Sequence, residues 1–455
     1  MDQKKRKVTM SLLVDKQTLD DLSIFAQRGK ASVFQLFNNT ATAGGSELLE
    51  EWFTYPLSDA AAIEKRAETI GYFIDHPTTF PFASIWFDQA LFYLDMTDER
   101  SRLHGGNKSF KERIQSLLGA DTEYRKIVSG ISSCTQIIHR WKTLLADAST
   151  GAGSRYTEQL AQFATTLRET ALDALPLIDE KQRIKREDVI RYDNILRFEE
   201  KDVFRRLLRD IYMFDVYLTA AQAAREHGFS MPSVYQGEME EVSFDHVFHP
   251  LIEGAKSNSI LMDKTHNITF LTGANMAGKS TFMKSLGIAL FLAHMGFPVP
   301  ARQLVFSPRN GLYTSINLPD NIQMGYSHFY AEVLRVKKVA QQLAEGKKLF
   351  VIFDEMFRGT NVKDAYEGTV EIASRLYQHP RCQFVLSTHI LEAGEQLRQS
   401  HPHIQYVFLP TVMKDGLPTY TYALQKGITE DRHGMVIIEN EGIIDLLTLQ
   451  NPTQI

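Results

Sequence analysis

The chain has 455 residues, of which 44% are hydrophobic and 23% are charged, and its formal net charge is −5. This length allows two or three domains with sizeable cores, and the composition is ordinary for a globular protein. The net charge argues against a uniformly basic coat for nucleic acid, although a local basic groove remains compatible with it.

Two cysteines, Cys134 and Cys382, lie far apart without the spacing of a metal site. We interpret both as reduced thiols in the core of a cytoplasmic protein. No apolar run reaches the length of a membrane span, so we expect no membrane partner. The basic residues at positions 4–7 have no apolar stretch behind them, and we expect no signal peptide.

From the start to about residue 235, apolar residues recur at helical spacing. Leu48, Leu49 and Trp52, for example, form one stripe of a helix that Pro56 ends. Such stripes are typical of a helical core, and we assign no chemistry to them.

Basic and acidic residues are mixed along residues 180–210. Mixed charges on a helix are typical of a solvated face with paired side chains. The alternative is a lever whose basic side approaches a DNA backbone, and the pattern leaves both interpretations open. The apolar helix that follows, Ile211–His227, is expected to end at Gly228, and Pro232 marks a domain boundary.

After residue 235, β-branched and aromatic runs alternate with helical stretches. This alternation predicts a mostly parallel sheet wrapped by helices. The expected strands are Ile268–Leu271, Leu349–Phe353, Phe384–Leu386, Tyr406–Leu409 and Tyr420–Leu424. We therefore predict an all-helical domain over residues 1–235 and an α/β domain over residues 236–455.

A phosphate-binding loop is predicted where the first of these runs ends, because residues 273–280 have the pattern Gly-x-x-x-x-Gly-Lys-Ser. An apolar strand precedes the loop and a predicted helix, Thr281–Leu290, follows it. Backbone N–H groups of the glycine-rich turn would converge on a phosphate, and the helix N-terminus would add its positive dipole end. A glycine turn between a core strand and a core helix is the alternative, but it would not explain the Lys-Ser pair.

Two side chains of the loop have specific expected roles. Lys279 would neutralise the β- and γ-phosphates, and the Ser280 hydroxyl would hold Mg²⁺. The predicted nucleotide-binding residues are Gly273, Ala274, Asn275, Met276, Ala277, Gly278, Lys279, Ser280 and Thr281.

Two carboxylates, Asp354 and Glu355, follow the apolar run Leu349–Phe353. Ligands of open α/β sheets bind at the carboxyl ends of the strands, so both acids are expected beside the phosphate loop. Asp354 would support Mg²⁺ through Ser280 or water, and Glu355 would orient and deprotonate the water that attacks the γ-phosphate. An exposed acidic turn is the alternative.

Two further polar segments are expected near the phosphates. The strand Phe384–Leu386 is followed by His389, which could reach the γ-phosphate and report its presence, although a lone histidine is more often structural. Ser327 stands at the head of a predicted helix that runs to Leu343. A serine there is usually an N-cap, but anions also bind at helix N-termini.

Together these elements resemble the MutS family of mismatch-repair ATPases. The similar segments are residues 272–281, including the Asn275-Met276 pair, Ser327–Glu332 (Ser-Thr-Phe-x-x-Glu in the family), Asp354–Thr360 (Asp-Glu-x-x-Arg-Gly-Thr) and Ser387–His389 (Ala-Thr-His). Residues 43–57 and 215–232 look like parts of the family's helical core, so the resemblance spans roughly residues 32–445.

The resemblance implies an ABC/MutS-like P-loop NTPase domain with a mostly parallel sheet, preceded by an all-α core/lever domain. It implies ATP and Mg²⁺ as cofactors and a homodimer with composite ATP sites that closes around DNA. Ser327 would then reach the γ-phosphate of the partner's site. Tyr422 is the nearest equivalent of an aromatic residue that stacks on adenine.

The chain also departs from the family pattern. The mismatch-reading domain, its connector and its Phe-x-Glu wedge are not found in the sequence, and the helical part is short for a full DNA clamp. The segment after residue 442 looks like a trimmed dimerisation tail. Mismatch recognition and stable dimerisation are therefore open, whereas ATP hydrolysis is expected.

Three hypotheses follow. The first is a MutS-like DNA-binding ATPase that forms an ATP-gated clamp in DNA repair or recombination. The second is an ATP-gated binding protein for structured RNA, ribosomes or protein partners. The third, a chromosome- or transporter-type ATPase, would require a glycine-rich signature, which residues 325–330 do not have.

Overall fold

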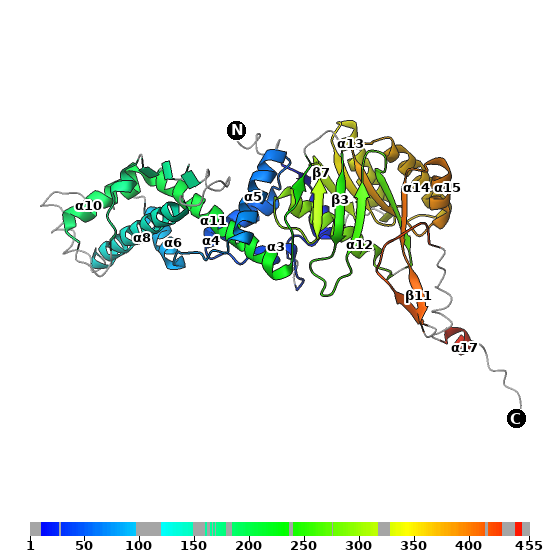
Figure 1. Ribbon diagram of the computed structural model, residues 1–455, viewed down its shortest axis with the longest axis horizontal. Coiled ribbons are helices and arrows are strands. Elements are labelled where there is room, and N and C mark those ends of the chain that lie inside the picture. The colour runs from blue at the N-terminus through cyan, green and yellow to red at the C-terminus, as the bar shows by residue number, and fades with distance from the viewer. Residues whose placement is uncertain are drawn as a thin grey trace, which may run out of the picture. The chain divides into compact units, whose positions relative to one another are not determined.

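The computed structural model describes most of the chain. The described residues are 11–26, 29–96, 120–148, 160–161, 164–165, 167–168, 170–178, 184–235, 240–274, 276–316, 328–414, 417–429 and 442–447. The chain forms two compact units: residues 1–36, 55–67 and 226–455 make the first, and residues 37–54 and 68–225 make the second (Figure 1). The division into domains at residue 235 stays a prediction, because compact units need not coincide with family domains.

A seven-stranded sheet is the centre of the first unit. Its order is β1-β7-β8-β9-β5-β10-β13, and every neighbouring pair is parallel except β10 with β13. The strands are β1 (Leu13–Val14), β5 (Ile268–Gly273), β7 (Gly311–Ser315), β8 (Leu349–Phe353), β9 (Gln383–Ser387), β10 (Gln405–Leu409) and β13 (Gln425–Lys426). The carboxyl ends of β5, β8 and β9 therefore lie side by side.

Helices cover both faces of this sheet, which explains why its strands are continuously apolar. On one face, alternate residues of β8 (Leu349, Val351 and Phe353) pack with residues of the three helices α13, α14 and α15 in one buried cluster. These helices are α13 (His328–Ala344), α14 (Val362–Tyr377) and α15 (Leu391–Ser400). Helix α12 (Lys279–His294) contacts β5 and β7 of this sheet.

A second, four-stranded sheet lies against α12. Its order is β2-β6-β3-β4, and α12 contacts β3 as well as the large sheet, so the helix is buried on nearly all sides. This position explains why α12 is apolar all round. The strands are β2 (Ser233–Val234), β3 (Val242–Val247), β4 (Asn258–Met262) and β6 (Gln303–Phe306).

Four of the five expected strands form as predicted, within two residues at either end. The fifth prediction, a strand over Tyr420–Leu424, is wrong. The chain instead makes the hairpin β11 (Thr411–Lys414) and β12 (Leu417–Tyr420), which projects from the sheet in Figure 1, and residues 421–424 form a loop before β13. Tyr422 has a left-handed φ of 55°, which breaks an extended strand at that residue.

The regular elements in the described residues of the second unit are all helical. They are α4 (Ala43–Thr54), the second half of α5 (Ala60–Asp75), α6 (Ser84–Leu94), α8 (Ala120–Ala148), the 3₁₀ turn Ala171–Ala174, α10 (Arg186–Asn194), the π-helical turn Ile195–Glu199 and most of α11 (Lys201–His227). Helices α6 and α8 pack along each other (Figure 1). Two short helices, α2 (Lys16–Asp21) and α3 (Val33–Phe37), precede them, and α17 (Ile443–Leu447) lies near the end.

A buried ion pair holds the helical unit at the π-helical turn. Arg197 donates to both carboxylate oxygens of Asp193 at 2.6 and 2.5 Å, and the Tyr93 hydroxyl donates to the same carboxylate at 2.7 Å. The side chains of Asp193 and Arg197 are each 1% exposed. Arg197 also donates to the carbonyl of Met96, two residues after the end of α6, at 2.8 Å. The Asp193–Arg197 pair therefore connects α10 to the end of α6.

Two expectations from composition can be compared with this fold. Cys134 and Cys382 are both free and buried, as predicted. Among the described helices, none combines the length and the apolar character needed to cross a bilayer.

Candidate nucleotide site

The loop between β5 and α12 has the backbone of a phosphate cradle. Gly273 and Gly278 have φ angles of 144° and 98°, and Met276 has a φ of 69°. A Cβ at Gly278 would lie 2.9 Å from Cδ1 of Tyr422, and one at Gly273 would lie 3.0 Å from the Leu409 carbonyl oxygen. Conformation and close packing therefore both require glycine at these two positions.

Lys279 lies at the mouth of the cradle. Its Nζ donates to the carbonyl oxygens of Gly273 at 2.8 Å and Ala274 at 3.1 Å. Burial lowers the pKa of the Lys279 ammonium, while the carboxylates of Asp354 and Glu355 act in the opposite direction. The ammonium is thus held by neutral acceptors of its own loop, close to where a phosphate would enter.

Asp354 is held by two hydroxyls. The Ser280 Oγ donates to its Oδ2 at 2.5 Å, and the Ser387 Oγ donates to its Oδ1. Its backbone N–H donates to the Ser315 carbonyl at 2.9 Å. Burial raises the pKa of the Asp354 carboxyl, although both hydroxyl hydrogen bonds favour the ionised form. A buried carboxylate with few compensating charges is a group that gains from a bound cation.

Glu355 contacts two basic side chains. Its Oε1 lies 2.6 Å from Nε2 of His389, and its Oε2 lies 3.2 Å from the Arg358 guanidinium. The hydrogen bond from His389 is the main reason why the pKa of the Glu355 carboxyl lies below its usual range. Glu355 has a φ of 55°, and its backbone N–H donates to the Ser387 carbonyl at 3.1 Å.

The sheet order explains how these residues meet. The phosphate loop follows β5, Asp354 and Glu355 follow β8, and Ser387 ends β9, which lies between those two strands. The residues predicted to act together are therefore brought to one edge of the sheet. Two of them, Asn275 and Ser327, lie outside the described residues.

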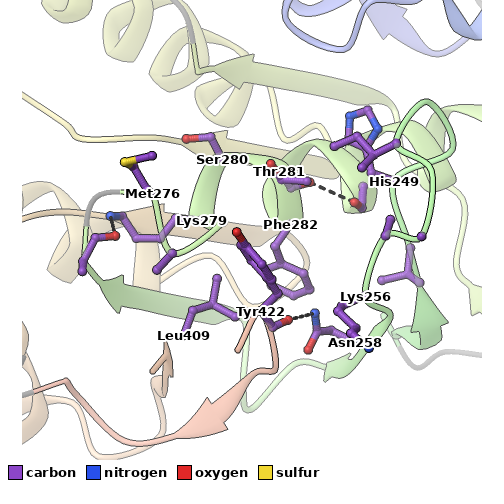
Figure 2. A pocket seen from close by; sticks show the side chains of 18 of the residues that line it. His249, Lys256, Asn258, Met276, Lys279, Ser280, Thr281, Phe282, Leu409 and Tyr422 are labelled. Carbon is purple, nitrogen blue, oxygen red and sulfur yellow. Dashed lines mark hydrogen bonds between the residues drawn. The ribbon is translucent and has the colours of Figure 1, made fainter. Parts of the chain in front are cut away.

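A pocket of about 690 Å³ opens beside the loop (Figure 2). Glu355 and Tyr422 line it together with much of the loop: Ala274, Met276, Ala277, Gly278, Lys279, Ser280 and Thr281. Its opposite wall comes from the β3–β4 connection, residues 247–258. Figure 2 shows the Tyr422 ring turned toward the loop, as its close approach to Gly278 requires.

Asn258 fixes the part of the wall that carries Tyr422. Its Nδ2 donates to the Tyr422 carbonyl at 3.0 Å, and its Oδ1 accepts from the Leu424 N–H at 2.7 Å. His249 lines the same pocket, and burial together with the charge of Lys284 lowers its pKa to about 4. Its ring is therefore neutral near pH 7.

Several residues of this site were not predicted. Ser387 stands in the predicted Ser-Thr-His segment, but its hydroxyl was assigned no role. Asn258 begins β4 of the second sheet and His249 lies in the β3–β4 connection, and the strands of that sheet were not expected. Arg358 belongs to the Arg-Gly-Thr box, and its spacing of three residues from Glu355 could have indicated the contact.

The oxygen donors of the site suit a hard cation. In the described part of the chain, no group of three or more His, Cys, Asp or Glu side chains could hold a metal ion alone. Mg²⁺ commonly takes one or two protein oxygens and completes its shell with water and substrate phosphates. The contact between the Ser280 hydroxyl and the Asp354 carboxylate matches such a partial donor set.

Comparisons with family models agree with the motifs. The model of MutS domain III matches residues 17–227, and the model of MutS domain V matches residues 269–448. Within the structure, the first match begins in α2 and the second begins in β5.

Curated relatives that cover most of the chain are named DNA mismatch repair protein MutS. The protein from Streptococcus sanguinis is 24% identical over 94% of this chain and 60% of its own length. The one from Thermotoga petrophila is 22% identical over 95% of this chain and 64% of its own length. The one from Petrotoga mobilis is 25% identical over 73% of this chain and 45% of its own length. The chain thus spans less than two thirds of these relatives.

Proposed function

The chain belongs to the MutS family, and from this premise we propose that it is a DNA-binding ATPase whose ATP site gates a clamp in DNA repair or recombination. One observation carries the proposal. Lys279, the Ser280–Asp354 pair and Glu355 meet at one edge of the sheet, beside a pocket of about 690 Å³.

ATP fits this site by the shape of its loop. Gly273 and Gly278, where a Cβ would not fit, let the backbone approach phosphates closely. Helix α12 begins at Lys279, so its N-terminus faces the same loop. Lys279 would exchange the carbonyl oxygens of Gly273 and Ala274 for phosphate oxygens. Tyr422 would stack on the base, since its ring lines the pocket next to Gly278.

Mg²⁺ would be held by Ser280 and Asp354. Bound there, the ion would neutralise charge that develops on the phosphates. The hydroxyls of Ser280 and Ser387 donate to the two oxygens of the Asp354 carboxylate. They favour its ionised form and fix its orientation.

Glu355 would act as the general base. A carboxylate whose pKa lies below its usual range is ionised near neutral pH and can orient and deprotonate a water. His389 lies 2.6 Å from the Glu355 carboxylate and would turn to the γ-phosphate of a bound ATP, which Ser327 would approach from a partner subunit.

The wider proposal joins residues 236–455 as the ATPase domain to residues 1–235 as a core/lever domain in a homodimer that binds DNA. The name of the relatives, DNA mismatch repair protein MutS, supports the DNA partner. Those relatives are longer than this chain, which covers 60% and 64% of their lengths. The proposal therefore does not include mismatch recognition.

Hydrolysis of ATP by the purified chain tests the central proposal. Glu355→Gln should lower the turnover number by about a hundredfold or more while ATP still binds, because the general base alone is removed. Lys279→Met should abolish binding. Wild-type turnover in the Glu355→Gln protein would sink the assignment of the site.

A second experiment tests the DNA partner. Fluorescence anisotropy with homoduplex, mismatched and branched DNA and with structured RNA, with and without ATP, should show DNA binding that weakens steeply with salt. Binding of RNA but not DNA at low salt would favour an RNA partner instead. Mass in solution of the Glu355→Gln protein with ATP tests the homodimer, and a monomer under every condition would refute a role for Ser327 in a partner's site.

A further inference from the structure

Strand β7 lacks a full neighbour on one edge. The two-residue strand β1 pairs only with Gly311 and Leu312, the first two residues of β7. Beyond them, two side chains of α2 take the place of a strand. The Thr314 N–H donates to the Thr18 hydroxyl at 3.0 Å, and the Ile316 N–H donates to the Asp21 carboxylate at 2.9 Å. The edge amides are thereby satisfied without strand pairing.

Arg335 of α13 completes this edge. Its Nε and one terminal nitrogen donate to the Thr314 carbonyl at 3.0 and 2.5 Å, and the same terminal nitrogen donates to the Thr18 hydroxyl at 2.9 Å. The fork of the guanidinium also pairs with both oxygens of Asp15, the N-cap of α2. Only 7% of the Arg335 side chain is exposed.

The other edge of the same strand end carries the metal-site carboxylate. Thr314 and Ser315 are in register with the last two residues of β8, and the Ser315 carbonyl accepts the Asp354 N–H at 2.9 Å. Ser315 and Asp354 also share a small void of about 10 Å³ with Val336, the neighbour of Arg335 on α13. Thus β7 ends between the Arg335 network and Asp354.

An apolar contact could fasten α13 to the sheet equally well, but it would leave the Thr314 carbonyl without the two hydrogen bonds that Arg335 donates to it. Removing a charge from water without pairing it costs several kcal/mol per ion in general. Here every group of the network has a partner, so the strand end is held in one position. The Asp15 carboxyl shows this balance: burial would raise its pKa, yet Arg335 and Lys338 bring the pKa well below its usual range.

We propose that Asp15, Thr18, Asp21 and Arg335 are positioning residues that set the place of Asp354 through the end of β7. The inference rests on the proposed ATPase function. It means that the position of Asp354 in the nucleotide site depends in part on residues that are far away in sequence. It also explains why residues 13–21 belong to the first compact unit, although α2 opens the MutS domain III match.

The test compares Arg335→Met with Lys338→Met. Lys338 also contacts Asp15, at 2.6 Å, but its side chain is 47% exposed, and among the described residues its ammonium is hydrogen-bonded to Asp15 and not to Thr314. Calorimetry measures the affinity of a non-hydrolysable ATP analogue with and without Mg²⁺. In Arg335→Met, the affinity for the analogue without Mg²⁺ should stay within about twofold of the wild-type value. The increase in affinity on adding Mg²⁺, the Mg²⁺ gain, should be about tenfold smaller than in wild type. The turnover number of Arg335→Met should fall roughly ten- to a hundredfold, the scale expected for a displacement of about 1 Å. Lys338→Met should match wild type in all three measurements.

Hydrogen exchange of residues 350–355 and thermal melting accompany these measurements. Exchange should quicken in Arg335→Met but not in Lys338→Met. If Arg335→Met does not fold, Arg335→Lys, which keeps the charge but loses the fork, should show the same selective loss of the Mg²⁺ gain. A folded Arg335 variant with wild-type Mg²⁺ gain and turnover would overturn the inference, as would an equal loss in Lys338→Met. Failure of the wild-type chain to bind or hydrolyse ATP would instead refute the proposed function.

Discussion

The Oε1 atom of Glu355 lies 2.6 Å from the Nε2 atom of His389, so the base proposed for hydrolysis is already engaged by a neighbouring ring. This hydrogen bond is the main cause of the lowered pKa of the Glu355 carboxyl. The relationship links the end of β8 to the segment after β9, and its loss has a defined consequence for the pH dependence of the proposed ATP hydrolysis.

His389→Asn should move the acid limb of the pH profile of kcat/KM to higher pH. The His389 hydrogen bond lowers the pKa of Glu355, so its removal raises that pKa, and more of the base is protonated at a given acidic pH. Turnover measured between pH 4.5 and 8 at ATP concentrations well below KM gives the shift, because kcat/KM reports the pKa of Glu355 in the protein without nucleotide. An unshifted acid limb would show that the titrating base is a different group. His379→Asn, at a histidine outside the pocket, is the control.

Gly278→Ala should weaken ATP binding by about tenfold or more, because a Cβ there costs about 1–2 kcal/mol in backbone strain and also meets the Tyr422 ring. The φ of Gly278 is 98°, and the distance to Tyr422 Cδ1 would be 2.9 Å. Gly346→Ala is the matched control, since Gly346 has a φ of 74° with no heavy atom within 4 Å of the added Cβ.

Adding Tyr422→Ala to Gly278→Ala separates the two causes. Compared with Tyr422→Ala alone, which already lacks the proposed stacking on the base, the double variant should lose only the affinity that backbone strain at Gly278 removes. Equal affinities of the Gly278→Ala and Gly346→Ala proteins would contradict the cradle described for this loop.

Arg197→Met should lower the free energy of unfolding of the helical unit by roughly 3–5 kcal/mol, because it leaves a buried Asp193 carboxylate without its ion pair. Arg191→Met is the control: its side chain is 64% exposed and lies 3.9 Å from Asp188, so its loss should cost at most about 1 kcal/mol. Urea denaturation followed by circular dichroism measures both. Similar costs for the two variants would show that Asp193 finds another partner.

Asp210→Asn should stabilise the helical unit more at pH 8 than at pH 5. Burial raises the pKa of Asp210 from 3.8 to about 7, against the opposing charges of Arg209 and Arg206. Because the folded-state pKa is the higher one, the contribution to stability is complete below about pH 4 and is lost as pH rises toward 7. The gain at pH 8 should be on the order of 1–3 kcal/mol after allowance for partial exposure. Asp202→Asn, at an exposed position of the same helix, is the control.

The phosphate loop and the apolar strand before Asp354 and Glu355 could be predicted because their signals are local. Residues 273–280 carry a fixed spacing, and Leu349–Phe353 is a strand buried on both faces, which gives an unbroken apolar run. Once both were placed in one parallel sheet, the meeting of Ser280 with Asp354 followed from the rule that ligands bind at the carboxyl ends of strands.

Other features could not be predicted, because their partners are remote in sequence. Strand β3 is short and partly exposed, and His246 with a φ of 53° interrupts its pairing with β4, so the second sheet gives little periodic signal. Asp15 and Arg335 are 320 positions apart, and each looks like a charge on a solvated helix. The hairpin before Tyr422 was missed because aromatic and β-branched residues continue through the loop.

The short strands on both margins of the large sheet have a consequence for handling the protein. β1 and β13 are two residues long, so neither offers a long template to which another chain could add a strand. The side chains of α2 shield the rest of the β7 margin. A chain that begins at residue 22 would lack α2 and expose the β7 margin, and this shortened protein should aggregate through that margin. A chain that begins at residue 11 keeps α2 and should stay dispersed.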